Sequence, residues 1–240
     1  MRVLVIAHHG EDSAGFVGDA LAARGAKLST HVFPDDGDLP PVEDFAAAVV
    51  LGARWSVYDD ATVGRWIGEE IDWLHRADST GVAVLGICFG AQVLTVAFGG
   101  AVERAPAPEI GWTTVEPVGP LVVGPGPWFQ FHYDRCALGP SAVLHARTGI
   151  APQAFSIGRN LGLQFHPEVG ADLLREWFEH GERELAQQAG LDPEVMLADT
   201  AAEEDAARGR AAELVSTFLE RTRPGWPHPI PGASALADAP

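Results

Sequence analysis

Short apolar runs constrain the fold of this chain more than any other feature of its sequence. They lie at residues 2–7, 46–51 and 82–85 and are rich in Val, Leu, Ile and Ala. Strands of a parallel sheet, which are buried on both faces, require runs of this kind. Apolar residues follow at helical spacing at residues 13–24 and 61–77, so strands and helices alternate along the chain. The sequence therefore predicts an α/β fold in three layers, with a mostly parallel central sheet and helices on both faces.

The pattern changes after residue 101, where helical spacing disappears. Short strand-like pieces, such as residues 112–116 and 161–165, alternate there with glycine and proline turns. This alternation predicts a small antiparallel extension of the sheet. Residues 171–189 have a helical pattern again, although Gly181 weakens it.

The end of the chain predicts additions to this core domain. Residues 193–222 favour one or two more helices, by default a helical hairpin whose apolar face meets either the core or a partner. The proline-rich end is typical of irregular structure, with Trp226 placed to dock it. We therefore expect a core domain, extra C-terminal helices and an irregular tail, at residues 1–190, 191–222 and 223–240. The oligomeric state stays open.

Composition excludes several classes of function. Of the 240 residues, 47% are hydrophobic and 20% are charged, which is enough apolar surface for a sizeable core. The net charge of −17 opposes binding to nucleic-acid phosphates and to anionic membranes. No apolar run approaches the roughly 20 residues of a membrane-spanning helix, and the N-terminal run is too short for a signal peptide. With only Cys88 and Cys136, a disulfide framework is not indicated, and we expect a cytoplasmic protein without nucleic-acid or membrane partners.

The heptapeptide GICFGAQ, residues 86–92, joins a predicted strand to a predicted helix. Its glycine–X–cysteine–X–glycine form is that of a nucleophile elbow, in which Gly86 and Gly90 let strand and helix approach closely. Cys88 would then project at the N-terminus of the helix, where the positive end of the helix dipole favours a thiolate. The next backbone N–H, from Phe89, could donate to an oxyanion. On this motif alone, a buried cysteine in a glycine-rich turn is an equally open alternative.

A cysteine nucleophile needs a base, and His166 in the segment QFHPE is the strongest candidate. His166 and Glu168 lie two apart on an extended segment, so their side chains point to the same side, and Pro167 stiffens the pair. The carboxylate can accept from one ring nitrogen while the other nitrogen faces the nucleophile. The alternative is a salt bridge at the end of a strand. His8 and His9 end the first strand and could line a pocket, although a structural or solvated role is favoured.

Together, GICFGAQ and QFHPE resemble the nucleophile elbow and the His/Glu motif of the class I (triad) glutamine amidotransferase family. The resemblance covers roughly residues 1–180. LGARWSVYDD, at residues 51–60, resembles the oxyanion loop of this family. PEIGW and FHYD, at residues 108–112 and 131–134, resemble stretches of its stand-alone members that are similar to the glutaminase domain of GMP synthase.

The resemblance implies a role for each residue of the triad. Cys88 would attack the side-chain amide of glutamine, and His166 would act as general base and then protonate the departing ammonia. Glu168 would orient His166. A covalent glutamyl thioester would form and be hydrolysed by water. We expect no cofactor and no metal, since HHGED at residues 8–12 is more typical of a loop at the end of a strand than of a metal site.

The resemblance also implies an oxyanion hole and a substrate pocket. The backbone N–H of Phe89 and one from the Gly52–Ala53 loop would form the hole, while Gln92 and the backbone near Tyr133 would help to hold the glutamine. The chain contains no Walker-type phosphate loop. An acceptor of the ammonia, or a synthetase, would therefore be supplied by another protein.

Three positions depart from the usual residues of the family. Ala53 stands where the oxyanion loop has a second glycine, Arg54 where it has proline, and Tyr133 where the WHGD stretch has glycine. Alanine makes a positive φ costlier than glycine does, and Tyr133 would crowd or reshape the glutamine pocket. Two alternatives therefore stay open. One is hydrolysis of a related γ-glutamyl amide or peptide, and the other is a catalytically silent regulatory relative whose oxyanion hole does not form.

Overall fold

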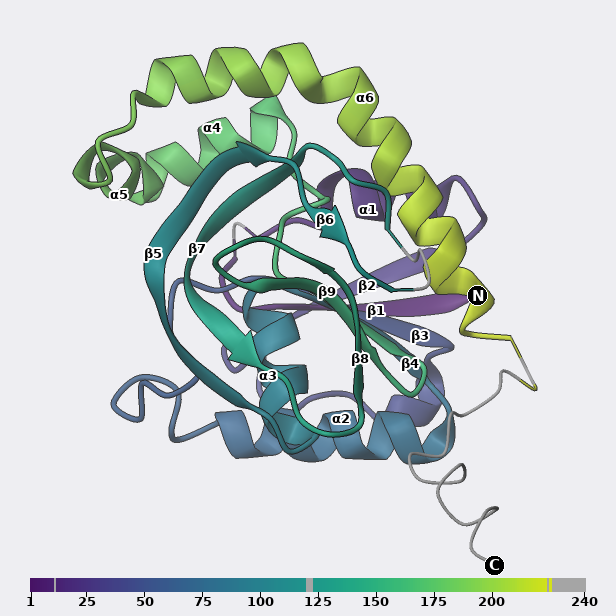
Figure 1. Ribbon diagram of the computed structural model, residues 1–240. Helices are drawn as coiled ribbons and strands as arrows, with labels where there is room; N and C mark the ends of the chain where they lie inside the picture. The colour runs from purple at the N-terminus through teal and green to yellow at the C-terminus, as the bar shows by residue number, and fades with distance from the viewer. Residues whose placement is uncertain (11, 120–122, 224, 226–240) are drawn as a thin grey trace, which may run out of the picture.

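The computed structural model describes residues 1–10, 12–119, 123–223 and 225 of the chain. Its central sheet grows from the apolar runs of the sequence, which supply parallel strands (Figure 1). These strands are β1 (Arg2–Ala7), β2 (Lys27–Val32), β3 (Ala47–Val50), β4 (Ala83–Ile87) and β10 (Asn160–Leu163). They lie in the order β2-β1-β3-β4-β10, so the strand order reverses between β1 and β3.

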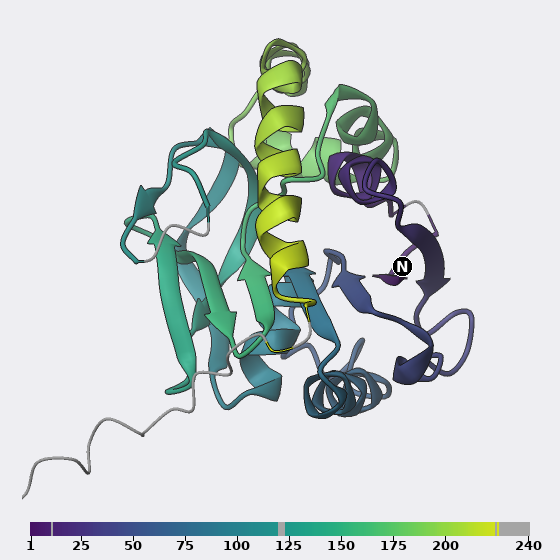
Figure 2. The same ribbon diagram turned by 90° about the vertical axis from the view of Figure 1, so that its right-hand side faces the viewer.

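Helices cover both faces of this sheet (Figure 2). Alternate residues of β1 explain why. Val3 and Val5 pack in one cluster with residues of α1 (Gly15–Ala22) and α6 (Pro193–Glu220). Leu4 and Ile6 point the other way and pack with residues of α2 (Ile67–Thr80) and α3 (Phe89–Ala97). The predicted three-layer α/β fold is confirmed.

Antiparallel strands form the second part of the fold. β9 (Pro152–Ile157), β8 (Ala142–Arg147) and β6 (Glu116–Pro117) extend the central sheet beyond β10, while β5 (Ala101–Thr113) and β7 (Trp128–Ala137) form a separate two-stranded sheet. The small antiparallel extension is thus confirmed. The strand expected within it at residues 161–165 is β10, which also joins the parallel part of the sheet beside β4. A short apolar run does not reveal the direction of its neighbours.

The helix expected at residues 61–77 begins later than predicted. It begins at Ile67, and residues 60–66 before it form turns, in which the N–H groups of Val63 and Gly64 bond to the carbonyls of Asp59 and Asp60. The short 3₁₀ helix η1 (Val42–Asp44) precedes β3.

The two helices after β10 are separated by the glycine that weakened their pattern. α4 (Ala171–Glu179) ends and α5 (Glu182–Gln188) begins on either side of Gly181, which has a φ of 118°. Only glycine adopts this left-handed region readily. α5 therefore turns away from the line of α4 and lies beside the functional site.

The expected C-terminal hairpin is wrong, because α6 is one helix of 28 residues. Asp192 caps it by accepting the N–H of Glu194 at 2.9 Å, and Pro193 in the first turn has its φ already set for a helix. Apolar residues near its C-terminal end are buried in the same cluster as β1: Leu214, Val215 and Phe218.

The proposed division of the chain at residue 190 stays a prediction. The expected irregular tail, with Trp226, lies outside the described residues except for positions 223 and 225. Within the described ranges, no helix is long and apolar enough to cross a membrane.

Candidate functional site

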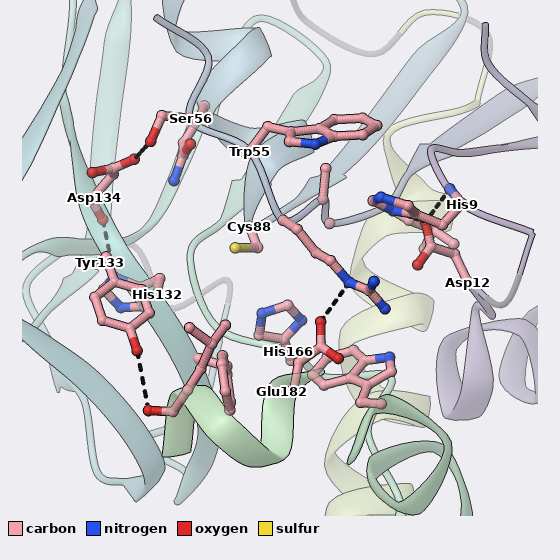
Figure 3. Close-up of a pocket in the computed structure, with 18 of the residues that line it drawn as sticks. His9, Asp12, Trp55, Ser56, Cys88, His132, Tyr133, Asp134, His166 and Glu182 are labelled. Carbon is pink, nitrogen blue, oxygen red and sulfur yellow. Dashed lines mark hydrogen bonds and ion pairs between the residues drawn. The ribbon is translucent and has the colours of Figure 1, made fainter. Parts of the chain in front are cut away.

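The two residues singled out by the motifs lie side by side at the carboxyl edge of the sheet. Cys88 directly follows β4, and His166 follows β10, which is the parallel neighbour of β4. Open parallel sheets bind their ligands at this edge. Figure 3 shows Cys88 and His166 close together in one pocket, to which both contribute lining.

Cys88 sits on a strained turn between β4 and α3. Its φ of 50° makes it the one non-glycine residue with a positive φ among the residues described. Such a conformation costs on the order of 1–3 kcal/mol and persists where the surrounding structure enforces it. The glycines on either side do so: a β-carbon on Gly86 would lie 2.6 Å from the carbonyl carbon of Gly90, and one on Gly90 would lie 2.3 Å from Val50 O. Both positions therefore require glycine, because β4 and α3 approach each other closely at Gly86, and α3 and β3 do so at Gly90.

His166 and Glu168 form a buried pair. Nδ1 of His166 lies 2.7 Å from Oε1 of Glu168, and the two residues are 5% and 2% exposed. Burial lowers the pKa of His166, but the electrostatic interactions of the ring with Glu168 and Cys88 outweigh it and raise the pKa to about 10. Nε2 of His166 has no hydrogen-bond partner within the described residues. The ring is thus held at Nδ1, while Nε2 is left for Cys88 and a ligand.

The expected oxyanion donors lie around Cys88. Phe89 is the first residue of α3, where an N–H has no partner inside the helix. Gly52 follows β3, and a β-carbon on it would lie 3.3 Å from Cε1 of His166 and 3.7 Å from Cβ of Cys88. Glycine at this position therefore lets the loop lie against both side chains. Ala53 avoids positive φ, so the strain expected from alanine here is absent in this conformation.

The pocket has a volume of about 140 Å³ and includes both expected substrate-binding residues. Gln92 reaches it from the first turn of α3. Tyr133 reaches it from β7 and does not point freely into it: its hydroxyl donates to Leu185 O of α5 at 3.5 Å, and the Arg104 guanidinium lies 4.7 Å from its ring centre. The tyrosine that replaces glycine thus ties β7 to α5.

Arg54 joins the pocket to α5 as well. Its Nε donates to Oε1 of Glu182 at 2.7 Å, and both residues line the pocket; Figure 3 draws this contact at Glu182. The sequence did not point to Glu182, because it lies far from Arg54 along the chain in a helix with no recognisable motif. A positively charged residue in place of proline was the one available signal.

The two histidines after β1 have different surroundings. His9 lines the pocket and its ring lies 4.5 Å from that of Trp55. His8 is buried against Glu70 of α2. Within the described residues, no group of three His, Cys, Asp or Glu side chains is arranged to hold a metal ion. Cys136 is buried, and burial raises the pKa of its thiol to about 12, so it is poorly suited to nucleophilic chemistry.

Comparisons with known proteins point to one family. The family model described as Glutamine amidotransferase class-I matches residues 19–176. The chain is 41% identical over 110 residues to the glutamine-hydrolyzing GMP synthase of Aeropyrum pernix, covering 40% of this chain and 22% of that protein. It is 33% identical over 177 residues to that of Thermomicrobium roseum, covering 69% of this chain and 31% of that protein. The chain therefore spans less than a third of the length of these two curated relatives.

Solved structures match more of the chain. A glutamine amidotransferase from Thermotoga maritima has a TM-score of 0.84 and 28% identity, covering 92% of this chain and 98% of that one. A glutamine amidotransferase from Methylobacillus flagellatus has a TM-score of 0.82 and 24% identity, covering 92% of this chain and 95% of that one, and shows the shared fold.

Proposed function

This chain belongs to the class-I glutamine amidotransferase family, and from that premise we propose that it hydrolyses the side-chain amide of L-glutamine with Cys88, His166 and Glu168. One observation carries the proposal. A cysteine on a strained strand-to-helix turn and a buried His–Glu pair follow adjacent parallel strands and share one pocket. A purely structural cysteine would need neither the strained turn nor the histidine beside it.

The first half of the reaction forms a thioester. His166 takes the thiol proton of Cys88, and the sulfur bonds to the amide carbon of glutamine. The resulting oxyanion accepts hydrogen bonds from the N–H groups of Phe89 and Ala53. His166 then donates the proton to the amide nitrogen, the C–N bond breaks and ammonia leaves. The raised pKa of His166 supports the imidazolium form that this step uses.

Water completes the reaction. Neutral His166 takes a proton from a water molecule, whose oxygen adds to the thioester carbon. The C–S bond breaks, glutamate leaves, and the proton returns to the sulfur of Cys88. Glu168 keeps Nδ1 of His166 occupied in both halves, so Nε2 carries every proton transfer. Gln92 and the backbone near Tyr133 hold the remainder of the glutamine, and the scheme uses no cofactor.

The ammonia acceptor is proposed to lie on another protein. The curated relatives are named GMP synthases, and this chain matches less than a third of their length. A synthetase that binds this chain would receive the ammonia. In its absence, ammonia would be released to water.

A second substrate class is favoured by one observation. Arg54 and Tyr133, which stand in place of proline and glycine of the family pattern, both line the pocket. Larger and charged lining residues change which group on the amide nitrogen of a γ-glutamyl substrate the pocket can accept. A γ-glutamyl amide or peptide would react through the same triad without ammonia transfer.

The test is ammonia release from L-glutamine by the purified protein, by a Cys88→Ala variant and by a Cys136→Ala control. We expect release that is lost with Cys88 and kept with Cys136, since Cys136 is buried and is not among the residues that line the pocket. A panel of γ-glutamyl amides and peptides, with product analysis, separates the two substrate classes by kcat/KM.

Covalent labelling of Cys88 by a glutamine-like electrophile tests the remaining alternative, a catalytically silent relative. Stoichiometric labelling at Cys88 contradicts the silent relative. No labelling, together with no hydrolysis of any panel member, contradicts the proposed hydrolase.

A further inference from the structure

A second buried His–Glu pair lies under the loop expected to form the oxyanion hole. His8, the first residue after β1, places Nε2 3.2 Å from Oε2 of Glu70, and both side chains are fully buried. Its other ring nitrogen, Nδ1, lies 3.2 Å from the carbonyl oxygen of Gly52. Neither His8 nor Glu70 lines the pocket, and the reaction scheme does not use them. A buried charged pair is costly to desolvate, so its position calls for a physical explanation.

The hydrogen bonds around His8 define its charge. Gly52 O can only accept, so Nδ1 of His8 donates to it, while Nε2 of His8 faces the Glu70 carboxyl group, and an imidazolium satisfies both contacts. Burial lowers the pKa of His8, but Glu70, the Gly52 carbonyl and Asp12 outweigh it and raise the pKa above 6.5. The rings of Trp66 and Phe89 enclose the remaining sides. Within the described residues, Oε1 of Glu70 has no hydrogen-bond partner, which leaves His8 as its counter-charge.

The bond from His8 also fixes a peptide plane. In a trans peptide, the C=O of Gly52 and the N–H of Ala53 point in opposite directions in the same plane. Because Gly52 O faces His8, which does not line the pocket, the Ala53 N–H points away from His8, and Gly52 and Ala53 themselves both line the pocket. No acceptor among the described residues receives this N–H. In the part of the chain that the structure describes, the donor therefore remains available to a ligand.

The same contact crosses the point where the strand order reverses. His8 follows β1 and Gly52 follows β3, and these two strands are neighbours that carry the chain to opposite sides of the sheet. Glu70 comes from the first turn of α2. Two segments, the end of β1 and the first turn of α2, thus hold one peptide of the loop after β3.

We propose that His8, tethered by Glu70, is a positioning residue that clamps the Gly52–Ala53 peptide with the Ala53 N–H directed at the developing oxyanion. The expected effect on kcat rests on the proposed hydrolysis of glutamine. The orientation of the Gly52–Ala53 peptide by His8 does not depend on it. Donors that are already oriented stabilise a transition state without reorganisation. The clamp explains how alanine at position 53 is compatible with catalysis. Because the peptide is already oriented, it does not have to rotate through a conformation that favours glycine.

Two substitutions at position 8 separate the two contacts of the ring. The amide of His8→Asn can occupy the place of Nδ1 and keep the bond to Gly52 O, whereas the longer His8→Gln can reach Glu70 and loses that bond. His145→Asn is the matched control, because His145 is equally buried and lies on β8, outside the pocket. Titration of Cys88 with iodoacetamide counts the intact sites in each variant. This alkylation of the thiol needs no oxyanion hole, so it does not depend on the clamp.

We expect His8→Gln to lower kcat per titrated site about 10- to 100-fold with KM little changed, below the 10²–10³-fold loss from removing a donor outright. His8→Asn should recover most of this activity, and His145→Asn should match wild type. Equal kcat per site in wild type and His8→Gln, or a loss confined to KM, would overturn the inference.

A crystal structure of the His8→Gln protein gives a readout that does not depend on turnover. The clamp predicts that the Gly52–Ala53 peptide rotates, with Gly52 O leaving its wild-type direction. An unchanged peptide contradicts the clamp. If wild type hydrolyses no γ-glutamyl compound, the proposed function fails, and this structure still decides whether His8 orients the peptide.

Discussion

Nδ1 of His166 and Oε1 of Glu168 lie 2.7 Å apart in a pair that is almost wholly buried. Burial lowers the pKa of His166, and the charges of Glu168 and Cys88 raise it to about 10. The imidazolium therefore persists above pH 6.5, the usual pKa of histidine, and is lost as the pH approaches the raised value. His166 should therefore remain able to donate a proton to the leaving ammonia above pH 6.5, and should lose this ability as the pH approaches the raised pKa.

Removing the Glu168 charge should move this limit. In Glu168→Gln, the amide can still occupy Nδ1 but no longer carries the charge that raises the pKa of His166. We expect the alkaline limb of the kcat profile to shift to lower pH. Profiles of kcat against pH for both proteins test this, with Glu176→Gln on α4 as a control. Superimposable alkaline limbs would contradict the assigned role of Glu168.

His8 predicts a pH dependence of stability. Its pKa is raised in the folded protein. The group therefore contributes stability that is fully present below the unfolded pKa and is lost as the pH rises through the folded pKa. His8→Asn should lower the free energy of unfolding more at about pH 6 than at about pH 9. Urea unfolding at both pH values measures the difference, and an equal loss at both would count against a charged His8.

Gly90 predicts a large effect from one added methyl group. In Gly90→Ala, the β-carbon would lie 2.3 Å from the backbone oxygen of Val50, which cannot move without shifting β3. We expect a loss of about 1–3 kcal/mol in the free energy of unfolding, as for other overpacked sites. Gly209→Ala is the control, because Gly209 lies in α6 with open space around it. That change should stabilise the protein by up to about 1 kcal/mol. Similar effects at both glycines would contradict the close approach at Gly90.

Arg54 and Glu182 form a partly buried ion pair, and Oε2 of Glu182 is buried without a hydrogen-bond partner among the residues described. Arg54→Met leaves that carboxylate without its charge partner. We expect the free energy of unfolding to fall by an amount between the ~0–1 kcal/mol typical of exposed ion pairs and the ~3–5 kcal/mol typical of buried ones.

The double variant Arg54→Met/Glu182→Gln should be more stable than Arg54→Met alone, because it removes the unpaired charge. Urea unfolding of the two single variants and the double variant completes the cycle. If the losses simply add, the two side chains do not interact in solution.

The sequence predicted the parts of the fold and site that depend on local patterns. Apolar runs identify the strands of the parallel sheet, and the glycines around Cys88 indicate a turn that no larger residue permits. His166 and Glu168 are two residues apart, so their meeting follows from an extended backbone. Their catalytic roles stay predictions until activity is measured.

The contacts that lie beyond local patterns could not be predicted in the same way. Arg54 with Glu182, and His8 with Glu70, join segments that only the packed fold brings together. The direction of β10 and the length of α6 depend on neighbours that a short run or a helical repeat does not specify. The position of His8, a polar residue directly after a buried strand, could be read from the sequence, but its partner Glu70 lies in α2, far along the chain.

The most direct test of the central claim is mass spectrometry of the protein quenched in acid during turnover of glutamine. We predict that the peptide containing Cys88 carries one glutamyl group as a thioester, and that the peptide containing Cys136 carries none. Hydrolysis of glutamine that continues in Cys88→Ala, or a glutamyl group on another residue, would contradict the account.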